Sequence, residues 1–186
     1  GPLSNRGTVG ESEANADAAV AAFRSAFADL LGVAAAGVVH GRSATQLTYD
    51  VSRALAKRWG PGDEIVVSRL DHDANVRPWL QAADAVGATV RWLDFDPATG
   101  ELDEGGLTTA ITGRTRLVAL TGASNLIGTI PPLRKVADAA HAVGALLWVD
   151  GVHLAAHRFV DVAALGADVF VCSPYKFLGP HCAVLA

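Results

Sequence analysis

Short runs of consecutive apolar residues alternate along this chain with longer, helix-like stretches. The runs that predict strands cover residues 38–40, 64–68, 89–95, 116–121, 145–149, 169–172 and 182–185. The stretches that predict helices cover residues 15–31, 44–59, 74–86, 107–111 and 132–143. Gly and Pro residues separate several of these segments, as in the turn Gly60-Pro61-Gly62. The pattern therefore predicts seven strands interleaved with helices.

Most of the predicted strands are continuous apolar runs, such as Ala145-Leu146-Leu147-Trp148-Val149. Strands of this kind are covered on both faces, which is typical of a mainly parallel sheet between helical layers. The link before the last strand is short, so we expect that strand to be antiparallel. The predicted fold class is α/β, a three-layer sandwich with a mainly parallel, seven-stranded sheet.

The composition agrees with one soluble globular domain. The chain has 186 residues, of which 51% are hydrophobic and 18% are charged. The net charge of −4 and the lack of a basic block argue against a nucleic-acid partner. No apolar run approaches the ~18 residues of a membrane span, and the first residues do not resemble a signal peptide. We therefore expect neither a membrane partner nor a secreted protein.

The two cysteines, Cys172 and Cys182, form neither a disulfide framework nor a metal-ligand pattern. We expect no metal site, and we expect an intracellular, cytoplasmic location because reduced cysteines suit a reducing compartment. Both cysteines lie in predicted strands, where free cysteine is commonly a small buried apolar residue. We therefore expect both to have a structural role.

Polar residues follow most of the apolar runs, and ligands bind open parallel sheets at the carboxyl ends of the strands. The segments that follow the runs are Ser43-Ala44-Thr45, Asp71-His72-Asp73, Ser124-Asn125, Asp150-Gly151-Val152-His153 and Ser173-Pro174-Tyr175-Lys176. Taken singly, these residues are also typical of helix caps, polar turns and surface lysines. Taken together, they place an anion cradle, an aromatic ring, a carboxylate and an amine along one edge.

That set is what pyridoxal 5′-phosphate (PLP) requires. Its phosphate needs hydrogen-bond donors, its ring needs a stacking partner, its pyridinium nitrogen needs an anion and its aldehyde needs an amine. Hydroxyl groups at a helix N-terminus, as in Ser43-Ala44-Thr45, suit a phosphate. The residues therefore predict PLP as the cofactor.

Four segments resemble group II cysteine desulfurases of the class V aminotransferase family. Asp71-His72-Asp73-Ala74-Asn75 is similar to their Glu-His-His-Ala-Asn, and Ser124-Asn125-Leu126-Ile127-Gly128 to their Ser-Asn-Val-Leu-Gly. Val149-Asp150-Gly151-Val152-His153 is similar to Val-Asp-Gly-Ala-Gln, and Ser173-Pro174-Tyr175-Lys176 to Ser-Gly-His-Lys. The segments occur in the family's order over nearly the whole chain. The resemblance implies the large domain of a fold type I PLP enzyme.

The resemblance also implies a role for each matching residue. Lys176 is expected to hold PLP as a Schiff base, and Asp150 to pair with the pyridinium nitrogen. His72 is expected to stack on the ring, and Asn125 to lie near the substrate carboxylate or the ring oxygen. The catalytic set is thus Lys176, His72 and Asp150.

The phosphate contacts implied by the resemblance come from Ser43, Ala44 and Ser173. The match is loosest here, because Arg42-Ser43-Ala44 keeps one hydroxyl of the family's Gly-Thr-Thr turn. Two departures resemble kynureninases instead: Tyr175 precedes the lysine where desulfurases have histidine, and His153 stands in place of glutamine. Tyr175 is expected to donate to the phosphate and His153 to the ring oxygen.

Three functions stay open at this point. The first is a PLP-dependent lyase or transferase acting on an amino acid, most like a cysteine desulfurase. The second is another PLP lyase, of kynureninase type, or an epimerase. The third is a non-catalytic PLP-fold domain.

The expected organisation is an N-terminal segment and helix at residues 1–32, followed by a PLP-binding large domain at residues 33–186. The family's C-terminal small domain, with its reactive cysteine and its substrate-binding arginine, is not recognisable in the sequence. We therefore expect a fragment that is inactive by itself, from an enzyme that the resemblance implies to be a homodimer.

Overall fold

One seven-stranded sheet forms the centre of the computed structural model, which describes residues 1–7 and 9–186. Its strands are β1 (Val39–Gly41), β2 (Glu64–Ser68), β3 (Thr89–Leu93), β4 (Thr115–Thr121), β5 (Leu146–Asp150), β6 (Val169–Cys172) and β7 (Ala183–Leu185). Their order in the sheet is β1-β7-β6-β5-β4-β2-β3. Strands β2 to β6 are parallel, whereas β7 runs antiparallel to both of its neighbours. The predicted fold class, strand number and antiparallel last strand are confirmed.

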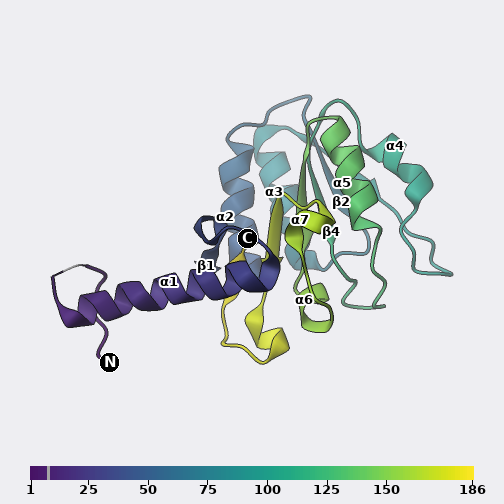
Figure 1. Ribbon diagram of the computed structural model, residues 1–186. Coiled ribbons are helices and arrows are strands. Elements are labelled where there is room, and N and C mark those ends of the chain that lie inside the picture. Colours follow the sequence, from purple (N-terminus) through teal and green to yellow (C-terminus); the bar gives the residue numbers. More distant parts are fainter. Residues whose placement is uncertain (8) are drawn as a thin grey trace.

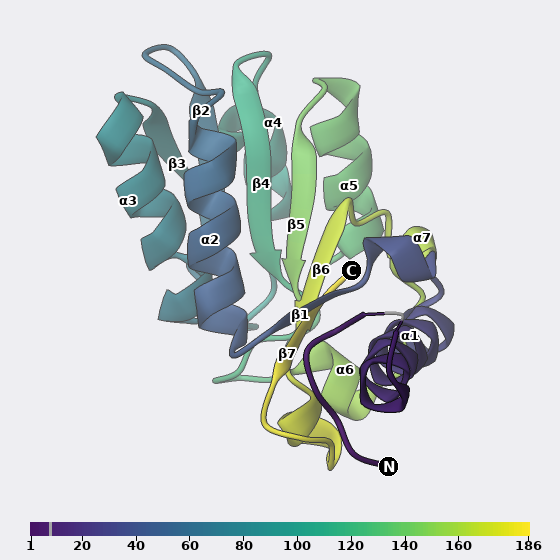
Figure 2. The same ribbon diagram turned by 90° about the vertical axis from the view of Figure 1, so that its left-hand side faces the viewer.

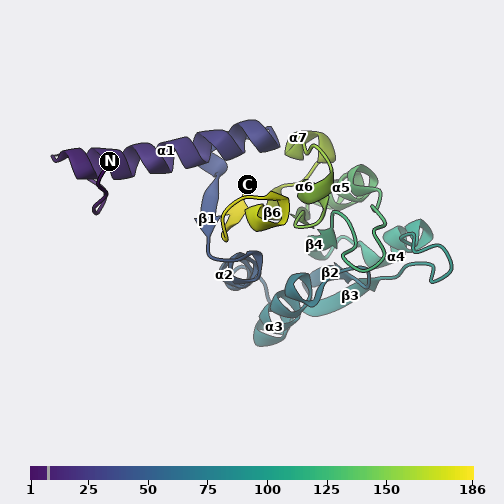
Figure 3. The same ribbon diagram turned by 90° about the horizontal axis from the view of Figure 1, so that it is seen from below.

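Helices cover both faces of the sheet. The α-helices are α1 (Glu11–Leu31), α2 (Ala44–Ala56), α3 (Arg77–Val86), α4 (Leu107–Ala110), α5 (Leu133–Ala142), α6 (Leu154–His157) and α7 (Val162–Leu165). Short 3-10 turns lie at η1 (Ala35–Gly37), η2 (Asp73–Asn75), η3 (Glu104–Gly106) and η4 (Pro174–Phe177). Helices α2 and α3 lie on one side of the sheet and α5 and α7 lie on the other (Figures 2 and 3). The result is the expected three-layer sandwich.

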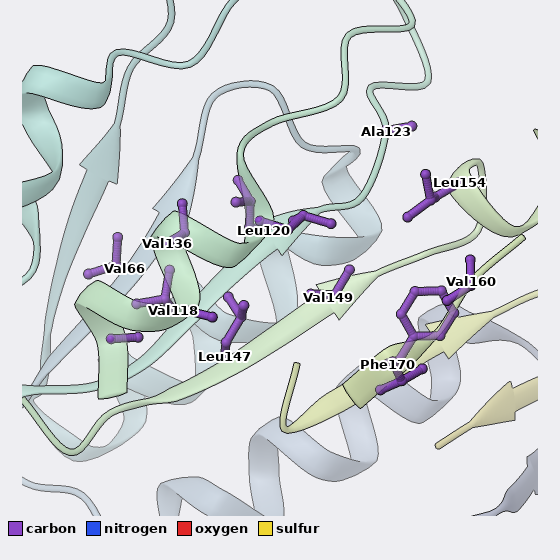
Figure 4. Close-up of a cluster of buried hydrophobic side chains, with 14 of the residues drawn as sticks. Val66, Val118, Leu120, Ala123, Val136, Leu147, Val149, Leu154, Val160 and Phe170 are labelled. Atoms are coloured by element: carbon purple, nitrogen blue, oxygen red, sulfur yellow. The ribbon is translucent and has the colours of Figure 1, made fainter. Parts of the chain in front are cut away.

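Alternate residues of each strand enter two separate hydrophobic cores. In β2, Ile65 and Val67 pack toward α2 and α3, whereas Val66 packs in the core on the opposite face. The side chains of this second core come from β2, β4, β5, β6, α5 and α6 (Figure 4). In the core beneath α3, the rings of Trp79 and Trp148 meet edge to face, with centroids 5.1 Å apart. Both faces of the central strands are therefore buried, as their apolar sequences predicted.

Helix α1 is longer than predicted and projects away from the sheet (Figures 1 and 3). It begins at Glu11 instead of residue 15, because the carboxylate of Glu13 accepts the backbone N–H groups of Val9 and Gly10 at 2.9 and 3.1 Å. It ends at Gly32, whose φ of +66° is the left-handed conformation that glycine adopts readily. The pattern of apolar residues did not predict this N-terminal cap by Glu13.

The predicted helix at residues 74–86 is divided in the structure. A 3-10 turn, η2, covers Asp73–Asn75, and α3 begins at Arg77. Pro78 lies in the first turn of α3, where its missing N–H costs nothing, but it prevents the helix from continuing backward. Helix α2 ends at Ala56, before the predicted residue 59, and the short helices α6 and α7 were not predicted.

The amino-terminal edge of the sheet contains a buried carboxylate, Glu64, at the start of β2. Arg114 donates to its Oε1 at 2.7 Å, Thr112 to its Oε2 at 2.6 Å, and Arg91 also pairs with it at 2.8 Å. Burial raises the pKa of Glu64, but the hydrogen bonds from Arg91, Thr112 and Arg114 outweigh burial and lower the pKa to about 2. This edge is therefore closed by a network of ion pairs around one buried carboxylate.

None of the helices that the structure describes has the length and apolar character needed to cross a bilayer.

Candidate active site

A cavity of about 150 Å³ lies at the carboxyl ends of β5 and β6, beside the first turn of α2. The residues that line it are Ser43, Ala44, Thr45, His72, Ala74, Asp150, Val152, His153, Ser173, Tyr175, Lys176 and His181. All of the predicted site residues except Asn125 belong to this set. The topology thus brings together side chains that are separated by more than a hundred positions in the sequence.

Asp150 provides the buried carboxylate of the cavity. It is the last residue of β5 and is 9% exposed. The backbone N–H of Val152 donates to its Oδ1 at 3.0 Å, and no Lys or Arg among the described residues forms an ion pair with it. Burial raises the pKa of Asp150, while the Val152 N–H and the nearby His72 act in the opposite direction. The carboxylate is therefore short of a positive partner.

Gly151 is required directly after this aspartate. A Cβ atom at this position would lie 1.8 Å from the Phe170 ring, which packs against the backbone here. A side chain at residue 151 would displace Phe170 from the core of the second face. The sequence pair Asp150-Gly151 thus combines a ligand-facing acid with a close core contact.

Lys176 lies in the 3-10 turn η4, which follows β6. Its side chain is exposed, and its Nζ lies 5.5 Å from the centre of the Tyr175 ring. The turn is tight: Gly179 N–H donates to the Pro174 carbonyl at 2.8 Å, and a Cβ on Gly179 would approach that oxygen to 3.0 Å. Leu178 adopts a left-handed φ of +68°, which costs energy for a residue other than glycine. The chain is therefore strained beside the lysine, as is common at functional sites.

The amino terminus of α2 contributes hydroxyl and backbone donors. Ser43 caps the helix, because its Oγ accepts from Gln46 N–H at 3.1 Å, which leaves the hydroxyl hydrogen able to donate elsewhere. The first N–H groups of the helix, at Ala44 and Thr45, have no acceptor within the helix and lie at the positive end of its dipole. Thr45 lines the cavity but was not among the predicted ligands; its hydroxyl, next to Ala44, was the available sequence signal.

Two histidines flank the carboxylate. His72 is exposed and precedes η2, and its Nδ1 accepts from Ala74 N–H at 3.0 Å. His153 is partly buried, and burial lowers its pKa, with further lowering by the positive charges of Lys176, His157 and His72. His153 is therefore held neutral near neutral pH, which keeps its ring able both to donate and to accept a hydrogen bond.

Tyr175 and His181 form one wall of the cavity. Their rings stack with centroids 4.7 Å apart and planes 10° from parallel. His181 was not predicted, because its position after Gly179-Pro180 is typical of a turn. The stack fixes the Tyr175 ring, and Lys176 extends over that ring.

Asn125 is the one predicted site residue that does not line the cavity. It is exposed in the turn after β4 and does not line the cavity. This turn is closed by two backbone bonds, from Gly128 to Ser124 at 3.0 Å and from Ser124 to Thr129 at 2.9 Å. The role expected for Asn125 stays a prediction.

The two cysteines lie apart from this chemistry. Cys172 and Cys182 are buried and do not line the cavity. Burial raises the pKa of Cys172 to about 12 and also raises the pKa of Cys182. Neither thiol is therefore an available nucleophile at neutral pH, in agreement with their expected structural role.

A larger cavity of about 700 Å³ lies near the end of β3. It is lined by five acidic residues, two threonines and seven apolar residues, namely Leu70, Asp94, Phe95, Asp96, Pro97, Thr99, Glu101, Leu102, Asp103, Glu104, Thr129, Ile130, Pro131 and Pro132. It contains neither an amine nor a histidine. Of the two cavities, the smaller one at Asp150 is therefore the one that combines a carboxylate with an amine and histidines.

Comparison with known proteins gives a consistent result. Residues 4–182 match the Aminotransferase class-V family. An aminotransferase-like protein of Gibberella zeae is 43% identical over 150 residues, and a cysteine desulfurase of Dickeya dadantii is 39% identical over 152 residues. These matches cover 80% and 76% of this chain but only 37% of each relative.

A solved structure shows the same fold. The cysteine desulfurase CsdA of Escherichia coli superposes with a TM-score of 0.85 at 34% sequence identity. The match covers 98% of this chain and 46% of the desulfurase. The chain thus spans less than half the length of the relatives that it resembles.

Proposed function

Because the chain belongs to the class V aminotransferase family, we propose that it is the cofactor-binding part of a PLP-dependent enzyme acting on an amino acid. One observation carries the proposal: the buried carboxylate of Asp150, which is short of a positive partner, and the amine of Lys176 line the same cavity. A buried carboxylate is stable only when a cation or a set of donors faces it. A pyridinium nitrogen would supply that charge.

The residues of the cavity fit PLP in chemical type. We propose that Asp150 binds the ring nitrogen and that His72 lies against the ring. The phosphate would be held by Ser43, the α2 N-terminus at Ala44 and Thr45, and Ser173, which is buried across the cavity. Tyr175, whose ring is fixed by His181, would donate to the same phosphate.

Lys176 is the proposed covalent attachment point for the PLP aldehyde. When bound, PLP supplies an electron sink that stabilises negative charge on the substrate carbon. While a substrate is bound, the Lys176 amine would be free to take up or release a proton beside that carbon. His153, held neutral, would donate a hydrogen bond to the ring oxygen, and Asp150 would keep the ring nitrogen protonated.

Two reactions remain candidates for the complete protein. Similarity to cysteine desulfurases favours release of sulfur from cysteine as the first candidate. Tyr175 and His153, which line the cavity, favour a cleavage of kynureninase type as the second. Since Cys172 and Cys182 are buried away from the cavity, a desulfurase would need a sulfur-accepting cysteine from outside the described residues.

We further propose that residues 33–186 form the large domain of a homodimer, that residues 1–32 join it as a separate N-terminal segment, and that it acts in the cytoplasm. The resemblance to the family supports this arrangement.

The test of PLP binding is direct. The chain is mixed with PLP, reduced with borohydride and digested, and mass spectrometry locates the pyridoxyl group. We expect it on Lys176, together with a visible absorbance band before reduction. Lys176→Ala should abolish both, whereas Lys57→Ala, which replaces an exposed lysine directly after α2, should leave both unchanged. Labelling spread over Lys57, Lys135 and Lys176 would contradict the proposal.

Assays of the protein with cysteine and with kynurenine separate the two candidate reactions. We expect alanine and sulfide from cysteine if the first candidate is right. Turnover of kynurenine with no sulfide from cysteine would establish the second.

A further inference from the structure

His181 lines the cavity, and the proposed function uses it only to hold Tyr175 in place. Its side chain is exposed and forms no ion pair with an acidic residue in the part of the chain that the structure describes. Among the described residues, the histidine rings that form hydrogen bonds are those of His72 and His141. Both ring nitrogens of His181 are therefore available to a ligand.

The strand register places His181 beside the amino terminus of α2. Strand β7 lies between β1 and β6 and is antiparallel to both. In the pair of β1 and β7, Gly41 lies opposite Ala183. Continued beyond these two residues, the same register brings His181 level with Ser43, the N-cap residue of α2. His181 therefore lies at the same end of the cavity as the hydroxyl and backbone donors of α2.

The stack with Tyr175 determines the direction in which the His181 ring can donate. The two ring planes are 10° from parallel, and their centroids are 4.7 Å apart. The N–H groups of an imidazole lie in the plane of the ring, so in this stack they point outward and not into the face of the Tyr175 ring. The Tyr175 hydroxyl is likewise attached at the edge of its ring. The two side chains can therefore donate side by side to one anion.

The charge of a phosphate group gives a reason for a further donor here. A phosphate monoester carries a charge of about −1.5 to −2 at neutral pH, and no arginine is among the described residues that line the cavity. In the proposed function Lys176 is bound to the aldehyde, and His72 and His153 are placed at the ring. His181 is the remaining side chain of the cavity wall that can bring a positive charge to the phosphate, because imidazole gains a proton near neutral pH.

We infer that His181, in its protonated form, is a direct ligand of the cofactor phosphate, beside Tyr175 and opposite the amino terminus of α2. The inference rests on the proposed function, which assigns the phosphate of PLP to this end of the cavity. A protonated ring binds an anion more strongly than a neutral ring. Anion binding should therefore weaken as pH rises through the range in which imidazole loses its proton.

The test separates donation from stacking. His181→Phe keeps a ring that can stack on Tyr175 but removes both ring nitrogens. The probe is sulfate, added to the chain without PLP, because sulfate has the shape of phosphate and keeps its charge over the range in which histidine titrates. NMR spectra of the backbone amides locate the bound anion, and we expect the signals of Ala44, Thr45 and His181 to shift together. Saturable shifts that leave His181 unaffected would overturn the inference.

The affinity for sulfate gives the main measurement. We expect His181→Phe to weaken sulfate binding at least about fivefold near pH 6, because a hydrogen bond between charged groups is lost. His141→Phe, the matched substitution of an exposed histidine of α5 that pairs with Asp168, should leave the affinity unchanged. An unchanged affinity in His181→Phe would show that the ring only supports Tyr175, and this result would also overturn the inference.

The pH dependence is a readout that a purely structural role would not change. The ratio of the sulfate affinities of the unsubstituted chain and His181→Phe should be largest near pH 6 and decrease toward about pH 8. The other titratable or charged groups that line the cavity or adjoin His181 are retained in both proteins, so this ratio reports on residue 181; they are Arg42, His72, Asp150, His153, Tyr175, Lys176 and Cys182. A ratio that is independent of pH would contradict the inference.

A comparison of PLP with pyridoxal, which lacks the phosphate, separates the inference from the proposed function. His181→Phe should weaken binding of PLP in an absorbance titration but not binding of pyridoxal. A chain that binds sulfate at His181 but gives no pyridoxyl label on Lys176 would overturn the proposed function alone. A chain that is labelled on Lys176, but in which His181→Phe changes neither sulfate binding nor the preference for PLP over pyridoxal, would overturn the inference alone.

Discussion

The two ends of the sheet each bury a carboxylate, but they treat its charge in opposite ways. At the amino-terminal edge, Glu64 is surrounded by Arg91, Arg114 and Thr112, and its pKa is lowered to about 2. At the carboxyl edge, Asp150 is also buried, but it has one backbone donor and a raised pKa. The polar groups of the first edge pair with one another and so stabilise the fold. The second leaves a charge uncompensated inside a cavity, which is what a binding site for a cation requires.

The largest effect is expected at the amino-terminal edge, where a substitution removes the ion pairs of Glu64. Glu64→Gln should lower the free energy of unfolding by about 3 kcal/mol at neutral pH, since the pKa falls from 4.5 to about 2 on folding. A lowered pKa gives stability that is present above pH 4.5 and is lost as pH falls toward 2. The difference between the two proteins in urea unfolding should therefore shrink between about pH 5 and pH 3. A difference independent of pH would show that Glu64 acts by packing alone.

At the carboxyl edge, removal of the buried charge is expected to increase the free energy of unfolding. Asp150→Asn should raise the free energy of unfolding of the PLP-free chain by about 1 kcal/mol, because it removes an uncompensated buried charge. Since the folded pKa of Asp150 is raised, this gain should be absent near pH 4 and grow toward neutral pH. The same variant should bind PLP at least about tenfold more weakly in an absorbance titration, equivalent to about 1.4 kcal/mol. Loss of stability in the PLP-free variant would contradict the comparison.

The smallest expected effect tests whether burial determines how much an ion pair contributes to stability. Arg116 pairs with Asp63 at 2.6 Å at the same edge as Glu64, but the Arg116 side chain is 48% exposed. Arg116→Gln should cost only about 0.5 kcal/mol, because exposed ion pairs are screened by water and salt. Urea unfolding at low and at high salt measures this, and the cost should disappear at high salt. A cost as large as that of Glu64→Gln would show that charge, and not burial, distinguishes the two edges.

The sheet could be predicted from the sequence because strands buried on both faces leave continuous apolar runs. The cavity followed from the same rule, since the ends of parallel strands lie on one edge and Asp150 and Lys176 each follow a run. The four-residue helices α6 and α7 could not be predicted, because so few residues show no helical period.

The electrostatic difference between the edges was also hidden in the sequence. Arg91 and Arg114 reach Glu64 from 27 and 50 residues away, so no local pattern links them. Asn125 follows a strand as the others do, yet it is exposed in its turn and does not line the cavity.

The two ends of helix α1 contribute unequally to the stability of the domain. Its 21 residues make a rod about 30 Å long, and only Ala28 and Leu31, near one end, are buried. Amide hydrogen exchange should therefore form a gradient along it, with the last turns protected as long as the sheet and the first turns opening by local fraying. One continuous helix would thus belong to two cooperative units.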